Sequence, residues 1–224
     1  MTEPNAGERL SVTSLVMMPA LITLAVSILR LVGELEHWPK VLFNPSAGGG
    51  AAIVGISWLP FIFGVYFALK LARAGEGPAS IGKAIGFAVL GFLLVFAGVF
   101  LAFGPKPAFP GKMVVGLLVM AVGGAAPLSA WPALAKTLVA YGYAARIPVA
   151  VIMFFAMRGN WGTHYDVLPP EYTGPTSFWG EYFAIALVPQ LVFWVAFTIT
   201  TGSLFGSVAS AVAHRGKAAA HATS

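Results

Sequence analysis

The sequence contains no cysteine, which excludes disulfides, thiolate metal sites and cysteine nucleophiles. Charged residues are also scarce, at 9% of the chain against about 25% in ordinary soluble domains. So few charges cannot cover the surface of a soluble protein of 224 residues, because a small domain leaves much of its area in water. A lipid bilayer removes that requirement, so the composition indicates an integral membrane protein.

Catalytic and nucleic-acid-binding signatures are missing as well. The 13 basic residues are scattered along the chain, whereas a nucleic-acid partner requires a basic patch or stripe, so we predict no such partner. There is no G-x-S-x-G motif, no H-E-x-x-H motif and no pair of histidines inside an apolar run. We therefore predict no cofactor, and we favour a non-enzymatic role over an enzymatic one.

Six apolar stretches are long enough to span a membrane, which takes about 20 residues of helix at about 1.5 Å each. They lie at 12–33, 51–72, 83–103, 112–129, 131–157 and from 178 onward. None shows the period-two alternation of a membrane β-barrel strand. The predicted fold is therefore all-α, a polytopic bundle of six transmembrane helices.

The expected bundle fills residues 12–214, between an N-terminal segment 1–11 and a flexible polar tail 215–224. Six crossings put both termini on one side, where basic residues are slightly more frequent than on the other. This excess predicts cytoplasmic termini in a multi-pass protein, which would lie in the inner membrane if the source is bacterial. The stretch 178–214 is either one long helix or a span followed by an interfacial segment.

Arg146 stands near the middle of the predicted fifth span, where a lone arginine costs about 3 kcal/mol on insertion scales. No acidic residue falls in the middle of a predicted span, so carbonyls, tyrosine hydroxyls, water or an anionic ligand must compensate the charge. We predict a ligand-binding polar cavity formed by Arg146, Tyr141 and Tyr143. The alternative is that the helix breaks at Pro148 and Arg146 snorkels to a water-facing end.

Polar and aromatic residues gather in the outer loops, most densely in RGNWGTHYD at 158–166. The predicted outer vestibule comprises Glu34, His37, Trp38, Trp161, His164, Asp166 and Glu181. Two histidines with carboxylates can hold a metal or act as general acid and base, but their spacing matches no ligand pattern, so the metal stays undetermined. The simpler interpretation is an interface anchor, with Trp and Tyr at the lipid headgroups and the charges in water.

Small residues recur at every fourth position in two of the predicted helices, which allows close helix packing. The predicted helix-packing residues are Gly82 and Gly86 in one helix, and Gly202, Gly206 and Ser210 in the other. The second ridge can serve packing within the bundle, a homo-oligomer or a larger membrane complex.

Three functions fit these features. We favour a small transporter or a solute- or lipid-binding protein, whose cavity near Arg146 takes a small anionic solute or a lipid headgroup. The first alternative is a non-catalytic subunit or scaffold that docks through the ridge at Gly206. The second alternative is a membrane enzyme with an outward-facing site of His164 and Asp166.

Overall fold

The structure is a computed structural model that describes residues 11–50, 52–170 and 172–222. It is 73% helical, and the described residues contain no strand, which confirms the all-α prediction. Within these residues, five helices are long and apolar enough to cross a membrane, and this supports a multi-pass membrane protein. Most of the predicted N-terminal segment, residues 1–10, lies outside the described residues.

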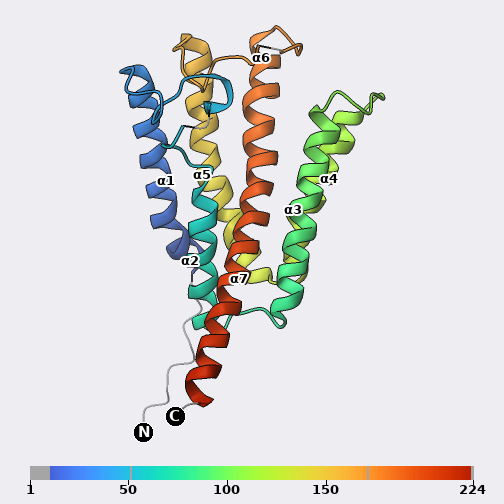
Figure 1. Cartoon of the computed structure of the whole chain (residues 1–224). Helices are drawn as coiled ribbons and strands as arrows, with labels where there is room; N and C mark the ends of the chain where they lie inside the picture. The colour runs from blue at the N-terminus through green and yellow to red at the C-terminus, as the bar shows by residue number, and fades with distance from the viewer. Residues whose placement is uncertain (1–10, 51, 171, 223–224) are drawn as a thin grey trace.

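The helices run up and down the long axis of the bundle (Figure 1). In chain order they are α1 (Val12–Leu35), η1 (Ala47–Gly49), α2 (Leu59–Arg73), α3 (Ile81–Phe103), α4 (Lys112–Ala125), η2 (Ala126–Ser129), α5 (Pro132–Gly159), α6 (Phe178–Glu181), η3 (Tyr182–Leu187), η4 (Pro189–Phe193) and α7 (Trp194–Ala222). Helix α1 begins at the end of the bundle where α7 finishes, and the long loops 36–58 and 160–177 lie toward the opposite end. This arrangement supports termini on one side, and their cytoplasmic location stays a prediction.

The predicted second span is only partly helical. Residues 52–58 form bends and turns, and α2 begins at Leu59 and has 15 residues, about 22 Å of helix at 1.5 Å each. Pro60 explains the late start, because it is tolerated in the first turn of a helix but clashes with a preceding carbonyl in the interior. The apolar stretch before α2 is therefore an irregular segment that enters the bundle from the loop end (Figure 1).

One continuous helical run extends from Phe178 to Ala222, which answers the question that the sequence leaves open. Two segments of it near the outer end, Tyr182–Leu187 and Pro189–Phe193, are π-helical, and the backbone N–H that Pro189 lacks interrupts the regular hydrogen-bond ladder between them. Helix α7 continues past His214 into the predicted polar tail, so that tail is helical as far as Ala222. Its flexibility stays a prediction.

Glycine contacts join α7 to α2 inside the bundle. A Cβ placed on Gly206 would lie 2.6 Å from the carbonyl oxygen of Gly64, and Gly202 contacts Gly64 as well. Ser210 is also buried, so the whole ridge faces inward. The prediction that Gly82 and Gly86 of α3 are helix-packing residues is wrong. Both are exposed, and a Cβ on Gly86 would meet nothing within 4 Å.

The packing face of α3 carries other glycines. A Cβ on Gly98 would lie 2.6 Å from the carbonyl oxygen of Gly116 in α4, and Gly91 approaches the backbone of Gly123 equally closely. Spacing by four places two small residues on one face of a helix, but it does not say which face meets a neighbour.

We expect Gly206→Ala to lower the Tm of the purified protein, because its Cβ would press on the backbone of Gly64. Overpacking of this kind costs about 1–3 kcal/mol. Gly86→Ala is the matched control, since its Cβ enters open space and should leave the Tm unchanged or slightly higher. The measurement is thermal unfolding in detergent, and equal Tm changes in both variants would contradict the packing assignment.

Candidate functional site

A cavity of about 420 Å³ extends from the outer loops toward the middle of the bundle. Pockets that bind small molecules have volumes of about 300–1,000 Å³, and this cavity falls in that range. Its walls come from α1, the irregular segment before α2, α3, α5, the loop 160–177 and the π-helical part of the last run. Most of the lining is apolar, and the polar side chains on it are Ser27, Arg30, Ser57, Arg146, His164, Tyr165 and Gln190.

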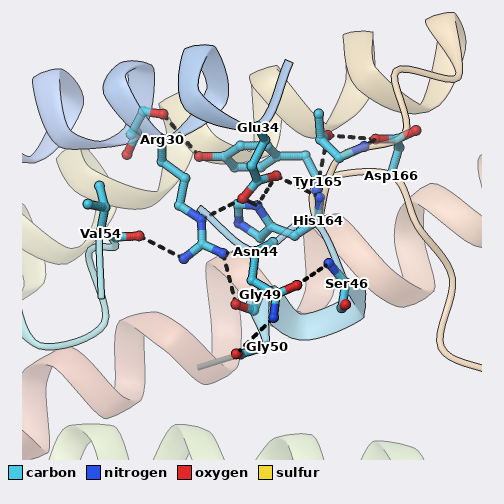
Figure 2. Close-up of polar contacts among 12 residues, drawn as sticks. Arg30, Glu34, Asn44, Ser46, Gly49, Gly50, Val54, His164, Tyr165 and Asp166 are labelled. Atoms are coloured by element: carbon cyan, nitrogen blue, oxygen red, sulfur yellow. Dashed lines mark hydrogen bonds and ion pairs between the residues drawn. The ribbon is translucent and has the colours of Figure 1, made fainter. Parts of the chain in front are cut away.

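Arg30 and Glu34 lie one turn apart on α1 and form a buried ion pair, with 2.7 Å between Arg30 Nε and Glu34 Oε1. Arg30 also donates from Nη1 to the carbonyl of Val54 at 2.8 Å, and from Nη2 to the carbonyls of Asn44 and Gly49 at 2.9 Å each (Figure 2). The guanidinium therefore satisfies carbonyls of a segment that has no helix to satisfy them. Sequence analysis missed Arg30, although its spacing of four from Glu34 is the signal of a helical ion pair.

His164 joins the loop 160–177 to the same carboxylate. Its backbone N–H and its ring Nδ1 both lie 2.8 Å from Glu34 Oε2 (Figure 2). Burial lowers the pKa of His164, while the hydrogen bond to Glu34 opposes that shift. The imidazole is therefore neutral at pH 7 and donates from Nδ1 to the carboxylate. Glu34 thus holds α1 and the loop 160–177 together.

The rest of RGNWGTHYD forms a closed turn. Asp166 accepts hydrogen bonds from the backbone N–H groups of Gly162 and Thr163, at 2.8 and 2.7 Å, and from the Thr163 hydroxyl at 2.6 Å. Tyr165 points into the bundle, where its hydroxyl donates to the carbonyl of Ser27 at 3.1 Å. Asp166 is therefore occupied in its own turn and does not line the cavity.

The remaining vestibule residues do not converge on His164. His37, Trp38 and Trp161 are exposed, and Glu181 is half-buried at the start of the last helical run. Among the described residues, no group of three His, Cys, Asp or Glu side chains could hold a metal ion. The structure thus brings together Glu34 and His164 of the predicted vestibule, and it adds Arg30 to them.

Arg146 lies on α5 about 20 Å from the outer end of that helix at Gly159, given 1.5 Å per residue. Helix α5 is continuous through Pro148, and Arg146 is only 4% exposed, so its side chain does not snorkel to a helix end. Its Nη1 donates to Gln190 Oε1 at 3.3 Å, and its guanidinium carbon lies 4.5 Å from the centroid of the Trp194 ring.

The guanidinium of Arg146 is left largely unpaired. Its Nε is buried without a hydrogen-bond partner in the described part of the chain. No described carboxylate lies within 4.0 Å of it, because the two ion pairs of the described residues both involve Glu34. A full charge therefore faces a mostly apolar cavity with one long hydrogen bond and one aromatic contact.

The two tyrosines predicted beside Arg146 are placed elsewhere. The Tyr141 hydroxyl is 2.8 Å from Thr23 Oγ1, and Tyr143 is exposed on another face of α5. Neither lines the cavity. Gln190 and Trp194 occupy the positions beside Arg146, and because they follow it by more than forty residues, local spacing gives no signal for them.

We expect Glu34→Ala to destabilise the protein strongly, because it leaves Arg30 buried without its carboxylate and removes both bonds to His164. Breaking a buried ion pair on one side costs about 3–5 kcal/mol. Glu36→Ala is the matched control, since Glu36 lies two residues on and is exposed. Thermal unfolding in detergent measures both, and a Tm loss for Glu34→Ala no larger than for Glu36→Ala would contradict this role.

Comparison with known proteins adds no relative. No protein-family model, no curated protein and no solved structure matches this chain. Any function of this chain therefore has to be inferred from the chemistry of its own residues.

Proposed function

We propose that the protein binds a small organic anion in the cavity beside Arg146, either as a transporter or as a solute- or lipid-binding membrane protein. The observation that carries this proposal is a buried arginine whose positive charge has no described carboxylate within reach. A charge in such surroundings is costly unless it is paired, and a bound anion supplies the missing partner.

Arg30 provides an internal comparison for this argument. Both arginines line the same cavity, but Arg30 has a carboxylate and three backbone carbonyls as acceptors. The donors of Arg30 are therefore bonded to protein acceptors, whereas Arg146 has hydrogen-bond donors left for a ligand. Arginine also suits this task because its planar guanidinium matches carboxylate and phosphate oxygens.

The two alternatives have less support. The ridge of Gly202 and Gly206 packs against α2, so no free ridge supports a scaffold that docks through it. Of the two side chains of an outer enzyme site, His164 is bonded to Glu34 and Asp166 is bonded within its turn. Both alternatives stay predictions.

We expect Arg146→Gln to weaken binding of the preferred anion by about 10-fold or more, because hydrogen bonds to charged groups contribute about 1.5–3 kcal/mol. The measurement is isothermal titration of benzoate, octanoate and inorganic phosphate into protein in phosphatidylcholine nanodiscs. Arg158→Gln is the matched control, since Arg158 ends α5 and stacks on Phe178 away from the cavity lining.

An anion that binds equally to the wild type and to Arg146→Gln would overturn the proposal. Arg146→Lys should retain part of the affinity, because it keeps the charge but loses the planar donor array. Uptake of the labelled anion into proteoliposomes then separates a transporter from a binding protein.

A further inference from the structure

Four consecutive residues before α2 have backbone N–H groups with no acceptor in the described part of the chain. They are Gly55, Ile56, Ser57 and Trp58. By contrast, the N–H groups of Ile53 and Val54 just before them donate to backbone carbonyls at 3.2 Å each. Successive backbone N–H groups without acceptors carry a positive partial charge and attract anions.

Three of these four residues, Gly55, Ile56 and Ser57, line the same cavity as Arg146. Ile56 packs against the buried cluster that contains Val149 and Met153, which follow Arg146 by about one and two turns on α5. Arg146 is an independent sign of a ligand here, because its Nε is buried and unpartnered among the described residues.

The rest of the cavity lining is mostly apolar. It includes Val99 and Phe103 of α3 and Ile185 and Phe193 of the π-helical segments. Phe103 lines the cavity and is also 47% exposed, so the cavity reaches the surface of the bundle beside α3. A small hydrophilic anion such as phosphate would leave these apolar residues without a partner.

From this lining we infer that the ligand is an amphipathic anion. Its single anionic group binds between Arg146 and the backbone N–H groups of residues 55–57, and its hydrocarbon part lies along the apolar residues toward α3. This inference rests on the proposed function and specifies its ligand class. The ligand comes either from water, as a short-chain carboxylate, or from the membrane, as a long-chain one.

The test is displacement of radiolabelled octanoate from wild-type protein in phosphatidylcholine nanodiscs, corrected for octanoate taken up by empty discs. We expect acetate to compete at least about 10-fold more weakly than unlabelled octanoate, because acetate lacks the methylene chain that octanoate buries against the apolar residues. Octanol has the same chain without the charge, and it should not compete.

The outcomes separate this inference from the proposed function. If acetate or phosphate competes as well as octanoate and depends on Arg146, the proposed function stands and the amphipathic ligand is wrong. If octanol competes equally, the anionic group has no site and the inference is wrong. If no anion depends on Arg146, both proposals are wrong.

The free N–H groups have their own pair of variants. Ser57→Pro removes one backbone donor and should weaken octanoate binding, whereas Ser57→Ala keeps that donor and should bind as the wild type does. Equal binding by both variants would overturn the assignment of residues 55–57 to the anionic group. The competition series on the wild type decides the ligand class even if Ser57→Pro fails to fold.

The source of the ligand is tested with hexadecanoate carried in the nanodisc membrane. Its displacement of octanoate would indicate entry from the lipid beside α3. Retention of octanoate in its presence would indicate a water-soluble amphipathic anion that enters from the loop end.

Discussion

The outer half of this bundle depends on the burial of one guanidinium, that of Arg30. A buried arginine is stable only when its donors meet fixed acceptors, and here Glu34 and three backbone carbonyls provide them. The same bonds give acceptor carbonyls in the chain between α1 and α2 a buried hydrogen-bond partner. Since His164 binds the same carboxylate, the two long loops 36–58 and 160–177 are positioned through one ion pair on α1.

This anchoring also explains why a cavity exists. The segment before α2 is held against Arg30, where a Cβ on Gly55 would lie only 3.1 Å from Nη1, and it therefore does not wind into another turn of α2. Its N–H groups from Gly55 to Trp58 remain without acceptors in the described structure, and three of these residues face the cavity. The hydrogen bonds of Arg30 to backbone carbonyls and the N–H groups on the lining of the Arg146 cavity thus both result from the same irregular segment.

The sequence predicts the helical class and the depth of Arg146, because both follow from the length and position of apolar runs. Other features depend on which segments meet. The run at 51–72 is apolar enough for a span, yet Pro60 and the bonds to Arg30 shorten its helix. Gly82 and Gly206 have the same small-residue spacing, but only the helix face of Gly206 meets a neighbour. Gln190 reaches Arg146 across 44 residues, a distance that no local pattern encodes.

The charges around the cavity bear on the charge of the ligand that we propose. Arg30 and Glu34 neutralise each other, and His164 is neutral because burial lowers its pKa. Among the described lining residues this leaves one uncompensated charge, on Arg146. In surroundings of low dielectric, a monoanion would balance that charge, whereas a dianion would leave one negative charge unpaired and desolvated. A single carboxylate would therefore fit this cavity better than a phosphate dianion. The N–H groups before α2, which have no acceptor in the described structure, can donate to the carboxylate oxygen that does not accept from Arg146.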